Sequence, residues 1–293
     1  MRRSFSRSAA TYNAAAHLQR EVQGWLLDTL AYYDDPVQAR PAPQRVLDLG
    51  CGPGAATLAM AERWPKAQFI ALDWSLPMLQ RIDMPRRGLL RRGPDITRIC
   101  ADARALPLAA GSIDVVFSNL CLQWVDDLPA VLAGLRRVLR PGGLLLFSTF
   151  GPDTLGELRE AFAVADAERP HVSPFAAIAQ IGDALMQAGF RDPVVERDVL
   201  NTTYPDLRAL MRELQALGAT NALQQRRHSL TGKARFAAAT RAYEAHRRSD
   251  GHLPARWEII TAMAWAPQPG QPIREGGMDE ASIPVTGIPI RRR

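Results

Sequence analysis

The hydrophobic pattern of the chain alternates between short apolar runs and longer stretches with helical spacing. Apolar runs typical of buried strands lie at residues 45–49, 69–73, 96–100, 113–118 and 143–149. Helical spacing falls between them, at residues 55–64, 75–82 and 128–139. Because strands that alternate with helices form a mostly parallel sheet with helices on both faces, the sequence predicts an α/β fold.

The chain on either side of this central part is also patterned. Helical spacing covers residues 9–33 and 174–190, and a sixth and a seventh strand fit 194–199 and 257–264. We expect four units: an N-terminal helix and cap at 1–43, a core at 44–203 and 254–266, a helical insertion at 204–253 and a tail at 267–293. The insertion overhangs the strand ends, so we expect it to act as a lid or to bind a partner. The tail is rich in Pro and Gly, which predicts that it is disordered.

Composition limits the class of protein. The 293 residues, 47% of them hydrophobic, can bury one large α/β core plus an appended piece. No apolar stretch approaches the roughly 20 residues of a membrane span. The basic start Met1-Arg2-Arg3 is followed by polar residues instead of the apolar region of a signal peptide. We therefore expect a soluble, cytoplasmic protein.

The three cysteines show no sign of chemistry. Cys51, Cys100 and Cys121 have neither metal-ligand spacing nor an even count, and each lies in or beside a predicted strand. We interpret all three as small core residues and expect no metal site.

Positive charge gathers in one part of the chain. The formal net charge is +6, and between Asn201 and Asp250 nine basic residues stand against four acidic ones. Such a stretch suggests an acidic partner, which could be nucleic acid, a phosphate-bearing substrate or an acidic protein. The alternative is a solvated helical face.

Three glycines alternate directly after the first predicted strand, at Gly50, Gly52 and Gly54, and a helical stretch follows. Without a Cβ atom the backbone can turn sharply and a ligand can approach it, while the helix start offers unpaired N–H groups. The next apolar run ends at Asp73, whose carboxylate could accept hydrogen bonds from a ribose. The pattern indicates a nucleoside ligand; a nucleotide site of another kind, or a turn without a ligand, is the alternative.

The glycine spacing narrows the choice of nucleoside. It is G-x-G-x-G, with Asp48 two residues before the first glycine, whereas dinucleotide sites have G-x-G-x-x-G. Two later motifs accompany the predicted strands. Ala101-Asp102-Ala103 follows the third strand, and Arg140-Pro141-Gly142-Gly143 precedes the fifth. In these features the chain resembles the class I S-adenosylmethionine (SAM) methyltransferases. The resemblance implies a Rossmann-like sheet of seven strands, the seventh antiparallel, with SAM at the carboxyl ends of the strands.

The same resemblance implies roles for individual residues. Asp73 would hold the ribose hydroxyls and Asp102 the adenine amino group, while Trp74, Met78 and Ala103 would pack on the adenine ring. Trp74 and Met78 are equally compatible with the core. The full set of expected cofactor residues is Asp48, Gly50, Gly52, Gly54, Asp73, Trp74, Met78, Asp102, Ala103 and Asn119. In the leading helix, Tyr12 and His17 could help to close the site, although a core or surface position is the simpler interpretation of each.

The stretch after the fourth strand, Ser118 to Trp124, is informative for what it lacks. Enzymes of this fold that methylate the adenine amino group carry an Asn/Asp-Pro-Pro-aromatic motif there, whose oxygens accept the amine hydrogens. Leu120 and Cys121 offer neither proline nor such an acceptor. A substrate that needs no acceptor, such as an ionised carboxylate, fits better.

Further motifs narrow the resemblance to the malonyl-acyl-carrier-protein O-methyltransferases of biotin synthesis. These motifs are Tyr12-Asn13 with Leu18-Gln19-Arg20, Ser118-Asn119-Leu120 with Gln123-Trp124, Glu168-Arg169-Pro170-His171 and Leu217-Gly218-Ala219-Thr220-Asn221. The resemblance covers about residues 5–265. It implies SAM-dependent methylation of the free carboxylate of a malonyl thioester on an acidic acyl-carrier protein, which would explain the basic insertion. We further expect a monomer with no nucleic-acid or membrane partner.

Such a reaction needs little acid–base chemistry. A carboxylate with a pKa of roughly 4 is already ionised at neutral pH, so no general base is required. We expect Asn119, Gln123, Trp124 and Tyr12 to position the substrate, and an arginine from the insertion to orient its carboxylate.

Two other functions fit the same motifs. One is methylation of a small carboxylic acid such as trans-aconitate, which leaves the charge of the insertion unused. The other is an assembly factor related to that of respiratory complex I, which keeps a similar domain but acts on a protein.

Overall fold

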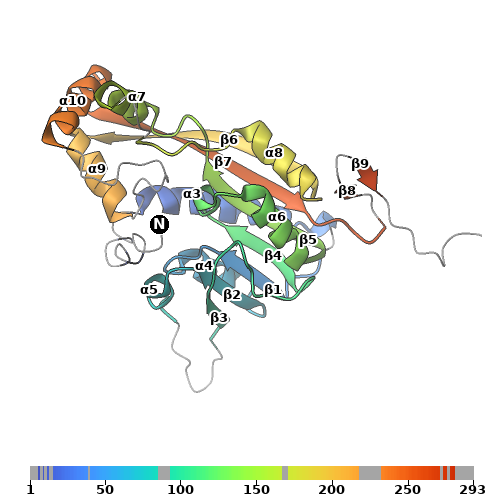
Figure 1. Cartoon of the computed structure of the whole chain (residues 1–293). Coiled ribbons are helices and arrows are strands. Elements are labelled where there is room, and N and C mark those ends of the chain that lie inside the picture. Colours follow the sequence, from blue (N-terminus) through green and yellow to red (C-terminus); the bar gives the residue numbers. More distant parts are fainter. Residues whose placement is uncertain are drawn as a thin grey trace, which may run out of the picture.

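A seven-stranded sheet forms the centre of the molecule (Figure 1). The computed structural model describes residues 16–38, 40–84, 93–166, 171–217, 232–270, 273–275 and 278–280, together with Ser6, Ala9 and Tyr12. The strands are β1 Arg45–Leu49, β2 Gln68–Asp73, β3 Asp95–Cys100, β4 Ile113–Ser118, β5 Leu139–Phe150, β6 Arg191–Tyr204 and β7 Leu253–Trp265. Their order is β3-β2-β1-β4-β5-β7-β6, and β7 runs antiparallel to both neighbours. The α/β fold and the antiparallel seventh strand are confirmed.

Helices cover both faces of the sheet because neighbouring strand residues point to opposite sides. Val46 packs in one hydrophobic core with α3 His17–Thr29 and α4 Ala55–Arg63, whereas Leu47 packs in the other with α6 Leu128–Val138 and α8 Ile178–Gln187. The Asp127 carboxylate caps α6 by accepting a hydrogen bond from the Ala130 N–H at 3.0 Å. A short helix, α5 Leu76–Leu79, follows β2.

The β6–β7 ladder extends beyond the carboxyl end of β5. Phe150, the last residue of β5, pairs with Ile259, while the ladder continues to the pair of Tyr204 with Leu253. Both strands are therefore longer than the predicted 194–199 and 257–264. Most residues of β6 are exposed or half-buried. The part of β6 beyond residue 199 therefore shows little of the apolar pattern by which a strand is recognised in a sequence.

Three helices pack on the extended part of this ladder: α7 Gly156–Ala165, α9 Leu207–Ala216 and α10 Lys233–Tyr243 (Figure 1, upper left). Their buried residues, among them Phe162, Leu210 and Tyr243, belong to the same hydrophobic core as Trp257 of β7. The predicted insertion therefore lies at the carboxyl ends of the strands, where α/β sheets bind their ligands. Its role as a lid stays a prediction.

Some predicted features lie at the margins of the described chain. Within the tail predicted as disordered, β8 Ile273–Glu275 and β9 Met278–Glu280 pair as a two-stranded sheet. The described residues do not include 281–293, nor the motif positions Asn13, 168–170 and 218–221. Two basic residues of the predicted insertion, Arg226 and Arg227, also lie outside them. Among the described helices, none has the length and apolar character needed to cross a membrane.

The interpretation of all three cysteines as core residues is wrong. Cys51 is buried, Cys121 is half-buried and Cys100 is exposed. Cys100 ends β3, which is the outer strand of the sheet, and most of its residues face solvent. A strand position therefore does not imply burial at the sheet edge.

Candidate functional site

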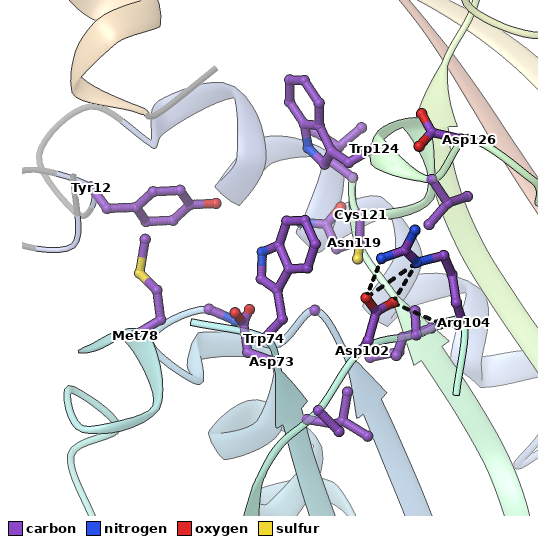
Figure 2. Close-up of a pocket in the computed structure, with 18 residues that line it drawn as sticks. Tyr12, Asp73, Trp74, Met78, Asp102, Arg104, Asn119, Cys121, Trp124 and Asp126 are labelled. Atoms are coloured by element: carbon purple, nitrogen blue, oxygen red, sulfur yellow. Dashed lines mark hydrogen bonds and ion pairs between the residues drawn. The ribbon is translucent and has the colours of Figure 1, made fainter. Parts of the chain in front are cut away.

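A cavity of about 210 Å³ opens at the carboxyl ends of β1, β2 and β4, and we call it the first cavity (Figure 2). Its wall is built by the end of β1, by Gly50 and Gly52 of the glycine turn, by the ends of β2 and β3, and by the loop after β4. It is lined by Tyr12, Leu49, Gly50, Gly52, Leu72, Asp73, Trp74, Met78, Ala101, Asp102, Ala103, Arg104, Asn119, Leu120, Cys121, Trp124, Val125 and Asp126. Most of the expected cofactor residues thus lie on one wall; Asp48 and Gly54 do not line it.

The glycines of the turn are required for different reasons. Gly50 has φ +71°, and a Cβ atom there would lie 2.3 Å from the Cys121 Sγ atom. Gly52 has φ +53° and lines the cavity, and its nearest neighbour to an added Cβ would be the Tyr12 Cε1 atom at 4.0 Å. Glycine at residue 50 is needed for packing, whereas glycine at residue 52 keeps the cavity open to a ligand.

Asp73 closes the turn from the end of β2. Its carboxylate accepts hydrogen bonds from the backbone N–H groups of Gly52, at 3.0 Å, and Ser75, at 2.7 Å. Burial raises the pKa of Asp73, and these two hydrogen bonds oppose the rise. A carboxylate held in this way keeps lone pairs available for the two hydroxyls of a ribose.

Asp102 is paired with a residue that the sequence analysis missed. Arg104 donates to it from Nη2 at 2.7 Å, and its backbone N–H donates at 2.9 Å (Figure 2). These hydrogen bonds hold the pKa of Asp102 below its usual value. An adenine amino group at this position would therefore share the carboxylate with Arg104. The sequence did contain a signal for this pair, because Arg104 lies only two positions after Asp102.

Two of the residues expected to position the substrate instead hold parts of the fold together by hydrogen bonds. The Asn119 amide donates from Nδ2 to the Gln19 carbonyl at 2.9 Å and accepts from the Ser148 hydroxyl at 2.9 Å, so it ties α3 to β5. The Gln123 amide donates to the Leu120 carbonyl at 2.8 Å and does not line the cavity. Leu120 has φ +45°, so this hydrogen bond supports a backbone turn that is unusual for leucine.

Tyr12 and Trp124 occupy the opposite side of the first cavity from the sheet (Figure 2). Burial, followed by the nearby Asp73 charge, raises the pKa of Tyr12, so its hydroxyl stays neutral and can donate a hydrogen bond. His17 is exposed, in agreement with a surface position. Trp74 and Met78 both line the cavity, so neither is a core residue alone.

The charge of the first cavity suits a cation. Among its described lining residues Asp73, Asp102 and Asp126 are acidic, and Arg104 alone is basic. SAM carries a sulfonium and an ammonium group against one carboxylate, so the acidic wall attracts it. Together with the open wall at Gly52 and the lone pairs of Asp73, the residues present fit this cofactor.

Asp48 lies beneath the wall and provides a first prediction. Burial raises its pKa to about 7, while a hydrogen bond of 2.5 Å from the Thr57 hydroxyl opposes the rise. Because the folded-state pKa exceeds the unfolded one, this group's contribution to stability is complete in acid and is lost as pH rises toward 7. Asp48→Asn should therefore gain about 2 kcal/mol of unfolding free energy relative to wild type between about pH 5 and about pH 7. Urea unfolding at both pH values measures this difference, and a constant difference would contradict it.

A larger cavity of about 470 Å³, the second cavity, lies under the helices of the extended ladder. Its lining is mostly aromatic and aliphatic, and its described charged or ionisable members are His171, Arg208 and Arg212. The lining residues are Trp124, Phe150, Thr154, Leu155, Leu158, Phe162, His171, Val172, Ser173, Phe175, Arg208, Met211, Arg212, Leu214, Gln215, Phe236 and Trp257. Trp124 lines both cavities, so the two are neighbours at this residue.

Comparison with known proteins agrees with this fold and site. Residues 47–147 match the family model of a methyltransferase domain. The YcgJ protein of Bacillus subtilis has a TM-score of 0.56 at 14% identity and covers 85% of this chain and 99% of its own. A phosphoethanolamine N-methyltransferase of Haemonchus contortus, solved with S-adenosylhomocysteine, has a TM-score of 0.52 at 21% identity and covers 84% of this chain and 53% of its own. The strand order, the glycine turn and the matched domain define a class I SAM-dependent methyltransferase.

Full-length relatives define the family within that class. The malonyl-acyl-carrier-protein O-methyltransferase of Xylella fastidiosa is 54% identical over 100% of this chain and 96% of its own. The protein of the same name from Gallionella capsiferriformans is 46% identical over 92% of this chain and 91% of its own. The chain belongs to the malonyl-acyl-carrier-protein O-methyltransferase family.

Proposed function

We propose that the protein transfers the methyl group of SAM to the free carboxylate of malonyl-acyl-carrier protein, forming the methyl ester that enters biotin synthesis. The observation that carries this proposal is the identity of 54% to a malonyl-acyl-carrier-protein O-methyltransferase over the whole chain. The site supports it, because an acidic cavity suited to a cationic methyl donor meets a cavity whose charges suit an anionic acceptor.

Alignment accounts for most of the catalysis in this proposal. SAM supplies an activated methyl group, and the malonyl carboxylate is ionised at neutral pH, so no side chain has to remove a proton. The glycine turn and Asp73 would hold the cofactor in the first cavity, and Trp124, which lines both cavities, would separate or position the donor and the acceptor. Holding the carboxylate about 3 Å from the methyl carbon, in line with the bond that breaks, is the remaining task.

The carrier protein is the acidic partner in this proposal, and the insertion is its docking surface. Arg247 is already engaged, since it pairs with Glu244 at 2.6 Å, and Arg248 pairs with Asp250 at 3.3 Å. Lys233 and Arg241 of α10 are exposed and form no ion pair with a described residue. We therefore assign docking to α9 and α10, in preference to the corner at residues 247–248.

Salt should distinguish a docked protein from a small substrate, which is a second prediction. Charge steering is screened as ionic strength rises, so kcat/KM with malonyl-acyl-carrier protein should fall about tenfold between about 0.05 and about 0.5 M salt. With a small malonyl thioester the fall should stay below about twofold. Steady-state kinetics on both substrates measures this, and an equal salt dependence would refute the docking role of the basic helices.

A panel of acceptors tests the proposed function itself. The protein is incubated with methyl-labelled SAM and, separately, with malonyl-acyl-carrier protein, trans-aconitate and other free dicarboxylic acids. We expect label on the carrier substrate with a kcat/KM far above that of any free acid. Preferential labelling of a free acid would indicate a small-acid methyltransferase, and labelling of none would favour an assembly factor.

We further propose that the protein acts as a cytoplasmic monomer, without nucleic acid or membrane.

A further inference from the structure

The second cavity has the size and lining of a ligand site. Its volume of about 470 Å³ lies within the range of roughly 300–1,000 Å³ that is usual for such sites. Aromatic side chains from elements far apart in the sequence line it, including Phe150 at the end of β5, Phe236 of α10 and Trp257 of β7. A few polar groups, from Thr154, His171, Ser173 and Gln215, interrupt this lining. Such a chamber accepts a long, moderately polar chain better than a compact dianion.

The polar groups are held in fixed positions. The His171 ring stacks on Phe162 with the ring centroids 4.4 Å apart, and its Nε2 atom lies 3.2 Å from the buried Asp166 carboxylate. The Thr154 hydroxyl is bonded to the backbone of Glu258 at 3.0 Å. The imidazole therefore has one orientation and one nitrogen committed to Asp166, which leaves it a defined partner for an amide or carbonyl group.

The mouth of the cavity is positively charged. Arg208, Arg212 and Gln215 recur at the spacing of one helix face on α9, and all three are exposed while also lining the cavity. The opposite face of α9 is buried through Leu207, Leu210 and Leu214. No carboxylate of the described chain pairs with either arginine, and no acidic residue is among the described lining residues. Two guanidinium groups one helical turn apart suit a phosphate.

We propose that the second cavity receives the malonyl-phosphopantetheine arm of the carrier protein, with Arg208 and Arg212 binding its phosphate at the mouth. This inference rests on the proposed function and specifies where its substrate lies. The arm passes the apolar wall with its amide groups beside His171 and Thr154, and the malonyl end reaches Trp124, where the first cavity begins. The phosphate stays at the rim because the carrier protein itself remains outside.

The test compares two small substrates that differ in one group. Malonyl-phosphopantetheine carries the phosphate, and malonyl-pantetheine lacks it. In the double variant Arg208→Ala and Arg212→Ala, KM for the first substrate should rise about 10- to 100-fold, while KM for the second should change by less than about twofold. SAM affinity and kcat at saturation should match wild type. The control is the double variant Arg45→Ala and Lys66→Ala, which removes two exposed cations that line neither cavity and lie outside α9 and α10, and it should leave both KM values unchanged.

A second variant tests the chamber apart from its charge. Met211 of α9 is half-buried and lines the cavity, so Met211→Trp should fill it and raise KM at least about tenfold for both substrates without weakening SAM binding. Equal KM values for wild type and the arginine variant, or an equal rise for both substrates, would overturn the phosphate assignment. If wild type methylates neither malonyl compound nor malonyl-acyl-carrier protein, the proposed function itself fails, which is a separate outcome.

Discussion

Replacing Gly52 by valine is expected to lower SAM affinity at least about 1,000-fold. An added Cβ atom at residue 52 has its nearest described neighbour 4.0 Å away, so the valine methyl groups extend into the first cavity, where SAM would bind. Since φ at this residue is +53°, valine also strains the turn and moves its N–H away from Asp73. Calorimetric titration with SAM measures the loss.

Gly111→Val is the matched control for this substitution. Gly111 has φ +59°, and an added Cβ atom there also meets nothing within 4 Å. It precedes β4 and therefore lies at the amino edge of the sheet, away from both cavities. The control should lose stability to a similar extent while binding SAM as wild type does. If both variants keep wild-type affinity, the glycine turn does not hold the cofactor.

Replacing Asp73 by alanine should weaken SAM binding by about 100-fold or more. A charge-assisted hydrogen bond is worth about 1.5–3 kcal/mol, and the carboxylate faces two ribose hydroxyls. The variant also leaves the N–H groups of Gly52 and Ser75 without their acceptor, which loosens the turn.

The graded control is Asp73→Asn, which keeps one acceptor oxygen for the turn but loses the charge. Because its amide nitrogen faces the backbone N–H of either Gly52 or Ser75, this variant should melt below wild type, and it should bind SAM with an affinity between those of wild type and Asp73→Ala. Calorimetric titration and thermal unfolding of all three proteins separate the two effects. Wild-type affinity in a folded Asp73→Ala protein would remove the ribose role of this carboxylate.

The central strands and the glycine turn were predictable because each depends on residues that are close in sequence. The run 45–49 carries Val46, Leu47 and Leu49, and every residue after Arg45 is buried, as expected for a parallel strand covered on both faces; the three glycines follow it directly. The outer half of β6 could not be found in this way, since its exposed residues carry no apolar period.

Other parts of the site depend on contacts that no local pattern reports. The role of Asn119 is set by Gln19, a hundred residues earlier, and by Ser148. The second cavity combines side chains from residues 124 to 257, so only the folded chain brings them together. The basic character of α9 was visible in the sequence, but the position of Arg208 and Arg212 at a cavity mouth was not.

The position of the transferred methyl group tests the central claim most directly. Malonyl-acyl-carrier protein is incubated with the protein and methyl-labelled SAM, and the product is analysed by intact and fragment mass spectrometry. We predict one added methyl group, located on the malonyl carboxylate of the phosphopantetheine arm and released by mild alkali as expected of an ester. A label on a side chain of the carrier protein, or no label on the malonyl group while another acid in the same mixture is methylated, would contradict the account.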